Sequence, residues 1–218
     1  MNAMNMKKGN RVLLASQSPR RRELLKLLFA DFGICVTNAD ETLPAGAPPG
    51  DAVREIALRK ARAAVREHSD ALVIAADTVV SIDRMILGKP RGAADAAQML
   101  RRLSGRTHQV YTGVALCRGG HEESFFVKTD VAFAPLDESE IAWYLATDEP
   151  FDKAGAYGIQ GYGARFITGI AGDYFNVMGL PIAAVYRHLK AYLEKTKKFC
   201  FMVEKIGNAY YNIIAFQS

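Results

Sequence analysis

Apolar positions along the chain alternate between short continuous runs and longer stretches with helical spacing. The run at residues 11–16 (RVLLAS) predicts a buried strand. Ser18 and Pro19 directly after it predict the start of a helix, because serine caps a first turn and proline fits its first position. A leucine-rich face continues that helix, formed by Leu24, Leu25, Leu27 and Leu28.

The central part of the chain predicts a long helix followed by a buried strand. Residues 51–68 have the helical pattern, and the run ALVIAADTVV at 71–80 predicts a central strand that ends in the polar step Asp77-Thr78. A Pro/Gly-rich loop at 38–50 precedes the helix and is too irregular to form an element.

The second half of the chain predicts a hairpin, further helices and a glycine-dense segment. Runs at 108–117 and 124–133 predict antiparallel strands joined across residues 118–120. The remaining elements expected are helices at 93–103 and 137–146, a strand at 164–170 and a last helix from Pro181 to about residue 192. This mixture predicts an α/β or α+β fold in which helices flank a mixed, twisted sheet.

Length and composition favour one substantial domain. The chain has 218 residues, half of them apolar, which is enough to bury a sizeable core. We expect one domain over residues 11–195, an N-terminal extension at 1–10 and a C-terminal extension at 196–218 to which the sequence assigns no role. The formal charge of +5 suits an anionic partner but does not distinguish a nucleotide from a nucleic acid or a membrane.

Cysteine usage and hydropathy favour a cytoplasmic protein. Cys35, Cys117 and Cys200 stand far apart without a CxxC pair, so neither a disulfide framework nor a zinc ribbon is indicated. No apolar run approaches the ~18 residues that a membrane span needs, and the first residues do not have the apolar core of a signal peptide. We therefore expect reduced thiols and a cytoplasmic location.

Three arginines crowd the start of the first predicted helix, in the segment SQSPRRR at 16–22. The helix dipole already places partial positive charge there, so the arrangement repels itself. A bound anion relieves that repulsion, because backbone N–H groups, the hydroxyls of Ser16 and Ser18 and the forks of Arg20 and Arg21 match phosphate oxygens. A solvated basic turn explains the pattern equally well at this point.

Lys60 falls on the apolar stripe of the long helix, beside Val53, Ile56 and Ala57. One interpretation is that its stem lies along the core while its ammonium group reaches water, which is the commoner fate of such a lysine and which the pattern alone slightly favours. The other is that it reaches over the sheet to a phosphate or a carboxylate in a cleft.

A set of carboxylates and a further lysine suggests a metal and phosphate site. Asp77 follows an apolar strand, and functional carboxylates gather where strands of open α/β sheets end. Lys89, in the turn Gly88-Lys89-Pro90, supplies a second candidate cation for phosphate. Glu41, and less surely Asp40, would complete with Asp77 an oxygen-rich set suited to Mg²⁺ or Mn²⁺.

The segment GAYGIQG at 155–161 is dense in glycine and lets the backbone approach a ligand. Gln160 within it can donate and accept hydrogen bonds at a base edge. A tight turn that needs glycine only for its backbone angles explains the segment as well. The histidines do not have the spacing of metal ligands, and we expect surface or structural roles for His68, His108, His121 and His188.

With these motifs in place, residues 11 to about 192 resemble the Maf family of nucleotide pyrophosphatases. The resemblance is carried by five ordered motifs, SQSPRR, ADTVV, GKP, GAYGIQG and GDYFNVMGLP. It implies two lobes around a deep cleft, an architecture related to inosine triphosphatase, and cleavage of a nucleoside triphosphate between its α and β phosphates. It also implies a divalent metal cofactor, Mg²⁺ or Mn²⁺.

The resemblance also implies roles for individual residues. Asp77 matches the family's proton acceptor, and Glu41 helps to hold the metal together with Asp77. The phosphate-binding set matches Ser16, Arg20, Arg21, Lys60 and Lys89. Arg20, Thr78 and Gln160 match positions associated with base choice, and the Asp-Thr and Ile-Gln pairs resemble the branch that acts on dTTP and UTP, not the branch that prefers 7-methyl-GTP.

Two rival functions remain at this level. One is a regulatory protein linked to septum formation or division arrest that binds nucleotide or nucleic acid without hydrolysis. The distinctive cations, however, accompany carboxylates and glycine loops and do not form a basic face interleaved with aromatics, so we expect no stable nucleic-acid binding. The other is a phosphomonoesterase or diphosphatase that uses the same cleft. A homodimer is compatible with the sequence.

Overall fold

The computed structural model describes residues 11–195, so the extensions expected at 1–10 and 196–218 lie outside the described residues. One mixed sheet with the strand order β2-β1-β3-β5-β6-β7 forms its centre, and β4 adds to it by pairing with β3. The strands are β1 (Val12–Ala15), β2 (Gly33–Cys35), β3 (Leu72–Ile82), β4 (Met85–Leu87), β5 (Thr107–Arg118), β6 (His121–Phe133) and β7 (Ile167–Ala171).

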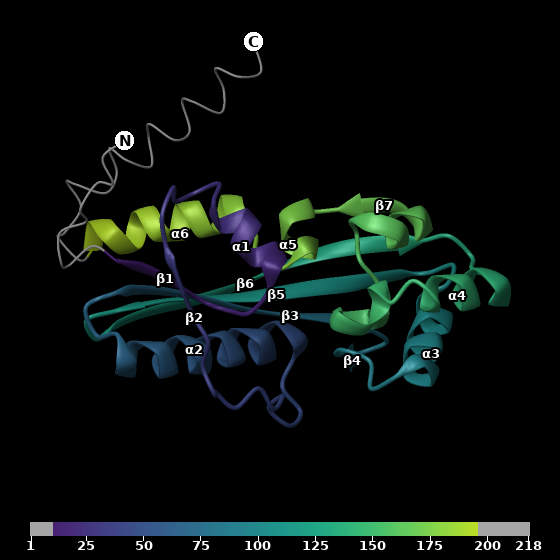
Figure 1. The fold of residues 1–218 in the computed structure, drawn as a ribbon, viewed down its shortest axis with the longest axis horizontal. Helices are drawn as coiled ribbons and strands as arrows, with labels where there is room; N and C mark the ends of the chain where they lie inside the picture. The colour runs from purple at the N-terminus through teal and green to yellow at the C-terminus, as the bar shows by residue number, and fades with distance from the viewer. Residues whose placement is uncertain (1–10, 196–218) are drawn as a thin grey trace, which may run out of the picture.

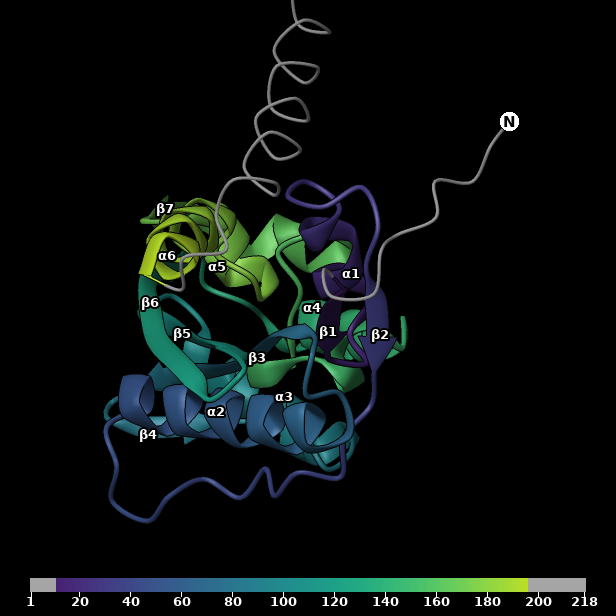
Figure 2. The same ribbon diagram turned by 90° about the vertical axis from the view of Figure 1, so that its left-hand side faces the viewer.

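Helices cover both faces of the sheet (Figures 1 and 2). They are α1 (Pro19–Leu25), α2 (Pro49–Glu67), α3 (Ala93–Leu103), α4 (Glu138–Leu145), α5 (Tyr174–Met178) and α6 (Ile182–Lys195), with short 3₁₀ turns η1 (Glu149–Asp152), η2 (Ala154–Ala156) and η3 (Gly161–Phe166). Helix α2 lies on one face, and α1, α5 and α6 lie on the other. The expectation of a mixed α/β fold is confirmed.

The apolar pattern is divided between the two faces by the alternation of strand side chains. Leu14 and Ile74 point to the side of α1 and α6, whereas Leu13 and Val73 join the alanines of α2 in a separate cluster. A further cluster lies where β3 and β5 continue toward α3 and α4. The long strands β3 and β5 therefore carry core packing at both ends of the molecule.

The strand that carries Asp77 is longer than the sequence indicated. Asp77 does not end β3 but lies in its middle, paired with Gly113 of β5, and the strand continues to Ile82. The prediction of a strand end at Asp77 was wrong, because the residues that follow also find partners in β5 and in the three-residue strand β4.

On one edge of β3, however, Asp77 lies where no neighbouring strand of the described chain pairs with it, as at the end of a strand. Strand β1 stops at Ala15, opposite Ala75, and β4 begins to pair only at Val80. Within residues 11–195, the stretch of β3 between these positions is bonded to β5 but has no ladder partner on its other edge. This opening in the sheet is where the candidate site lies.

The predicted cap of the first helix and the predicted hairpin turn are confirmed. Ser18 caps α1 by accepting a hydrogen bond from the Arg21 amide, and Asp137 caps α4 in a capping box. The β5–β6 hairpin turns through Gly119 and Gly120, whose φ angles of 55° and 81° suit glycine. No helix of the described residues is long and apolar enough to cross a membrane.

Candidate active site

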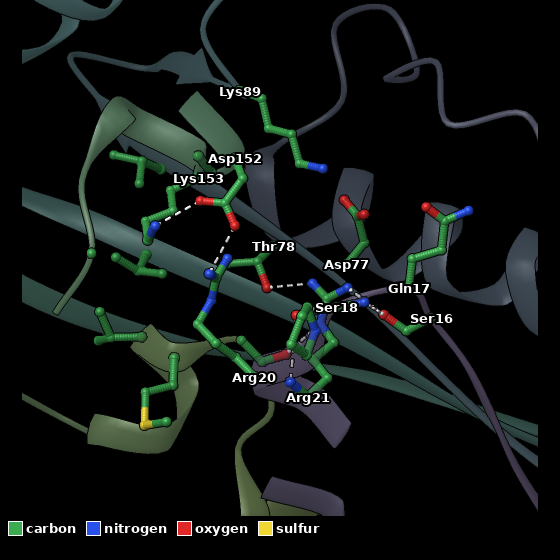
Figure 3. Close-up of a pocket in the computed structure, with 18 of the residues that line it drawn as sticks. Ser16, Gln17, Ser18, Arg20, Arg21, Asp77, Thr78, Lys89, Asp152 and Lys153 are labelled. Carbon is green, nitrogen blue, oxygen red and sulfur yellow. Dashed lines mark hydrogen bonds and ion pairs between the residues drawn. The ribbon is translucent and has the colours of Figure 1, made fainter. Parts of the chain in front are cut away.

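A cavity of about 420 Å³ opens at the break in the sheet between β1 and β4. Apart from Asp40, the residues that the sequence singled out for catalysis, substrate or metal line it. These residues are Ser16, Arg20, Arg21, Glu41, Lys60, Asp77, Thr78, Lys89 and Gln160. They come from six separate segments of the chain, so the fold brings together residues up to 144 positions apart. Figure 3 gives a close-up of the labelled members.

Lys60 links the two carboxylates expected to hold a metal. Its ammonium group lies 2.7 Å from Asp77 Oδ1 and 2.8 Å from Glu41 Oε2, and the residue is only 7% exposed. The interpretation that Lys60 reaches over the sheet is confirmed, and the alternative that it extends to water is wrong. A lysine this buried needs a counter-charge, which Asp77 supplies at closest range.

The packing of α2 makes this contact available. Gly113 of β5, directly opposite Asp77, is buried, and a Cβ there would collide with the Val53 carbonyl group of α2. The absence of a side chain lets the helix backbone lie directly on the strand. Lys60, seven residues after Val53 and so about two helical turns along, then extends over the sheet to Asp77.

Arg21 anchors a relay of hydrogen bonds behind the cavity. Its guanidinium donates to the Gly179 carbonyl at 2.8 Å, to Thr78 Oγ1 at 2.9 Å and to Ser16 Oγ at 3.3 Å. Burial lowers the pKa of Arg21, with the nearby Asp77 acting in the opposite direction. The guanidinium still carries its charge, because arginine is not deprotonated in proteins.

The direction of this relay follows from proton counting. The buried Thr112 hydroxyl donates to the Asn176 carbonyl at 2.9 Å, so its oxygen must accept from Thr78, which lies at 3.0 Å. Thr78 in turn accepts from Arg21. The Thr78 hydroxyl therefore accepts a hydrogen bond from Arg21 while it donates its own proton to Thr112.

Asp152 and Lys153 are members of the site that the sequence did not single out. Asp152 accepts from Arg20 at 2.9 Å and forms an ion pair with Lys153 at 2.6 Å, which joins η1 to α1 across the cavity. Both residues lie within three positions before the glycine-dense segment, and that position was the available signal. Gln17 and Ser18 also line the cavity, the latter while capping α1.

The glycine-dense segment is tied to the turn that carries Lys89. The Gly155 amide donates to the Gly88 carbonyl at 3.0 Å. Gly155 has a φ of 71° and lies against Val80, where a Cβ would be 2.8 Å from a methyl carbon. This contact seats the segment against β3 and leaves Lys89 and Gln160, both exposed, in the cavity lining.

The charged side chains of the lining give it a positive balance. Five cations, Arg20, Arg21, Lys60, Lys89 and Lys153, face three carboxylates, Glu41, Asp77 and Asp152. The difference of two positive charges favours a polyanion. Asp40, the less certain carboxylate, is not in the lining: it lies 3.5 Å from Arg59 and accepts from the Thr42 amide.

The oxygen donors of the cavity also fit a hard divalent cation. Asp77 and Glu41 converge on one ammonium group, so the two carboxylates already share a position of positive charge. Mg²⁺ is typically bound through one or two carboxylates together with substrate phosphates, and this donor set supplies the protein part of such a site.

The chain is similar to proteins of one family over most of its length. The family model described as Maf-like protein matches residues 11–192. A protein of Bacillus cytotoxicus named dTTP/UTP pyrophosphatase is 51% identical over 180 residues, which are 83% of this chain and 94% of that protein. A protein of the same name from Bacillus mycoides is 50% identical over 182 residues, 84% and 95% of the two chains. Among solved structures, the Ham1 protein of Staphylococcus aureus aligns with 17% identity and a TM-score of 0.47, covering 72% of this chain and 79% of that one.

Proposed function

The chain belongs to the Maf-like protein family, and from this premise we propose that it hydrolyses nucleoside triphosphates, dTTP and UTP above all, to the monophosphate and pyrophosphate. The relatives that carry the name dTTP/UTP pyrophosphatase are about half identical to it over nearly their whole length. Its substrate is a small nucleotide.

The observation that carries this function is the position of Asp77 within a cationic cavity. Asp77 is paired with the buried Lys60 and is 15% exposed at its side chain, while arginines and lysines outnumber carboxylates around it. The Lys60 ammonium group holds Asp77 Oδ1 at 2.7 Å and so fixes the position of the carboxylate that acts as the general base. The surplus of cations attracts the negatively charged triphosphate.

The reaction assigns one role to each group. Asp77 takes a proton from a water molecule as the water oxygen bonds to the α-phosphorus. The bond from that phosphorus to the bridging oxygen then breaks, and pyrophosphate leaves. Arg20, Arg21 and Lys89 bind the phosphate oxygens and stabilise the charge that develops on them, with Ser16 adding a hydroxyl. Catalysis depends mostly on positioning and electrostatics.

A divalent metal, Mg²⁺ or Mn²⁺, belongs to this proposal. Glu41 and Asp77 would hold it, and when bound it supplies charge neutralisation to the phosphates. Lys60 contacts the same two carboxylates and keeps them close together. The substrate phosphates would complete the oxygen ligands.

Base choice is assigned to Arg20, Thr78 and Gln160, which line the same cavity. Gln160 is exposed and carries both a donor and an acceptor for a pyrimidine edge. Arg20 is held by Asp152 at 2.9 Å, so its orientation is set by the opposite wall of the cavity. Thr78 is committed to Arg21 and Thr112, and it acts by fixing the shape of the site.

The test is product analysis by ion-exchange chromatography with dTTP, UTP and 7-methyl-GTP, each with and without Mg²⁺ or Mn²⁺. Wild type should release monophosphate and pyrophosphate from dTTP and UTP only when metal is present. Asp77→Asn, nearly isosteric but uncharged, should lower kcat by about 10²-fold or more while the chain stays folded. Wild-type turnover in Asp77→Asn contradicts the assignment.

Two comparisons sharpen this experiment. Asp130→Asn removes a carboxylate of β6 that does not line the cavity and should leave turnover unchanged. Lys89→Ala should mainly raise KM, because it removes a phosphate contact and leaves the proton acceptor in place. Release of inorganic phosphate in place of pyrophosphate would favour a phosphomonoesterase or diphosphatase.

The same assay distinguishes hydrolysis from the regulatory alternative. A protein that holds nucleotide without hydrolysis would bind dTTP and release no product under any metal condition. A nucleic-acid binder would instead show an affinity that falls steeply with salt concentration. We propose neither stable nucleic-acid binding nor a membrane partner. A homodimer remains part of the proposal, tested by sedimentation of the full chain.

A further inference from the structure

Outside the cavity, three potential metal ligands of different chemistry meet at the far end of α2. The sulfur of Cys35, a carboxylate oxygen of Glu67 and a ring nitrogen of His68 all lie within 4.8 Å of one another. Cys35 is the last residue of β2, Glu67 is the last residue of α2, and His68 directly follows it. Residues from two separate segments therefore converge at one point.

The local backbone explains how neighbours in sequence can serve one site. Two consecutive residues inside a helix point about 100° apart. His68, however, has left the helix, with φ of −137° and ψ of 61°, while its amide still bonds to the Ala64 carbonyl at 3.0 Å. This exit turns the imidazole toward the same side as the Glu67 carboxylate.

Cys35 is the ligand that the sheet contributes beside Glu67 and His68. It is 7% exposed and belongs to the cluster formed by the alanines of α2 and the inner side of β1 and β3. Its thiol lies 3.9 Å from the Val36 carbonyl, a weak contact. Within residues 11–195, the side chains of Glu67 and His68 form no hydrogen bond or ion pair that would compete for their donor atoms.

We propose that Cys35, Glu67 and His68 bind a thiophilic divalent cation such as Zn²⁺, at a site separate from the nucleotide cavity. Sulfur, nitrogen and carboxylate oxygen together form a typical ligand set for Zn²⁺, with a fourth position left for water. Mg²⁺ is excluded chemically, because it prefers oxygen ligands. The two sites of the molecule thus select different metals.

The electrostatic surroundings are consistent with a cation. Burial raises the pKa of the Cys35 thiol, and the negative charge of Glu67 raises it further, whereas Arg11 acts in the opposite direction. A bound cation would offset the first two effects by replacing the thiol proton. Arg11 is the positive charge that opposes metal binding, and Glu67 is the negative charge among the three ligands that favours it.

The position of the site gives it a structural consequence. Lys60 and Glu67 are seven residues apart on α2, roughly 10 Å along the helix, so the metal would not share ligands with Asp77 or Glu41. Cys35 is followed directly by Val36 and Thr37, which line the cavity. A cation would therefore fasten the end of β2, where the cavity wall begins, to the end of α2.

The test is a metal titration of the full, reduced chain carrying Glu41→Gln and Asp77→Asn, which removes the carboxylates of the nucleotide cavity. Co²⁺ serves as the spectroscopic probe, and Zn²⁺ is measured by competition with a chromophoric chelator. We expect one equivalent to bind with a thiolate-to-cobalt charge-transfer band, and Zn²⁺ to displace the Co²⁺. The readout needs no nucleotide, so it is independent of the proposed hydrolysis.

Variants locate the ligands. Cys35→Ser should abolish the charge-transfer band, and His68→Gln, at a half-exposed position, should weaken Zn²⁺ binding by about tenfold or more. Cys117→Ser and Cys200→Ser are the matched controls and should retain the band. The proposal is overturned if the chain carrying only Glu41→Gln and Asp77→Asn gives no band, if the band persists in Cys35→Ser, or if it disappears in Cys200→Ser.

Discussion

At the scale of single residues, the site depends on charged groups that protein partners already hold in place. Lys60 is divided between Asp77 and Glu41, and Arg21 between a backbone carbonyl and two hydroxyls. Such groups have little freedom to rearrange, so their positions are set before a ligand arrives. Preorganised charges of this kind are effective in catalysis because they need no reorientation during the reaction.

Substitution of Thr112 tests whether these fixed hydrogen bonds contribute to the site. Thr112→Val keeps the shape but leaves the Asn176 carbonyl without its donor and releases the Thr78 hydroxyl from its acceptor. The free energy of unfolding should fall by about 1–3 kcal/mol, because the Asn176 carbonyl group is buried and loses its donor. KM for dTTP should rise, since Arg21 loses a fixed partner. Urea unfolding and steady-state kinetics measure the two effects.

Thr168→Val is the matched control for Thr112→Val. Thr168 is exposed and donates to the Ala132 carbonyl at 3.2 Å, so water can replace that bond. Its stability should change by no more than about 0.5 kcal/mol. If the two valine variants unfold at the same urea concentration and have equal KM, the relay from Arg21 to Asn176 does not contribute to the site.

At the scale of elements, the contact between α2 and β5 determines how closely Lys60 approaches Asp77. Gly113 is the point of closest approach and lies opposite Asp77 in the sheet. Gly113→Ala should lower the free energy of unfolding by about 1–3 kcal/mol, because the added methyl group must push the helix away from the strand. It should also lower kcat, since Lys60 moves with the helix.

Gly169→Ala separates this effect from the general consequence of adding a methyl group to a strand. Gly169 lies in β7, is exposed, and a Cβ there meets no atom within 4 Å. We expect wild-type stability and turnover. The idea that α2 packing positions Lys60 fails if Gly113→Ala is destabilised but keeps its full kcat.

Most long elements could be predicted from the sequence, and the short ones could not. The helix at 51–68 and the hairpin at 108–133 have enough residues for their periodicity to be visible, and they appear as α2 and as β5 with β6. Strand β4 and helix α5 have three and five residues, which is too short for a pattern. Because β4 could not be predicted, no pattern in the sequence indicated that β3 continues beyond Asp77.

The site was predictable as a set of residues but not as a set of contacts. Each candidate cation and carboxylate in a recognised motif proved to line one cavity. That Lys60 contacts both Glu41 and Asp77 depends on the depth at which α2 packs, which no local pattern encodes. Asp152 was missed because its partner, Arg20, lies 132 positions away.

At the scale of the whole molecule, β3 and β5 join two core clusters across the cavity. One cluster lies under α1 and α6, and the other lies against α3 and α4. His108 belongs to the second region: it extends from β5, is fully buried, and its Nε2 is 2.7 Å from the Tyr157 hydroxyl. Tyr157 lines the cavity, so this contact supports one of its walls.

His108 should make global stability depend on pH. Burial lowers its pKa from 6.5 to about 4, with Asp130 opposing the shift. Between these two values the unfolded chain binds more protons than the folded one, so stability is complete above about pH 6.5 and falls as the pH decreases toward 4. The expected loss between pH 7 and pH 5 is about 2 kcal/mol from this residue.

Urea unfolding at pH 7 and pH 5 isolates that contribution when variants are compared. His108→Gln removes the titrating group, so its stability should differ between the two pH values by about 2 kcal/mol less than that of wild type. His121→Gln, at an exposed position in β6, should keep the wild-type difference. Equal pH dependence in wild type and His108→Gln would mean that the buried imidazole is not what weakens the fold in acid, and that another group carries the proton uptake on unfolding.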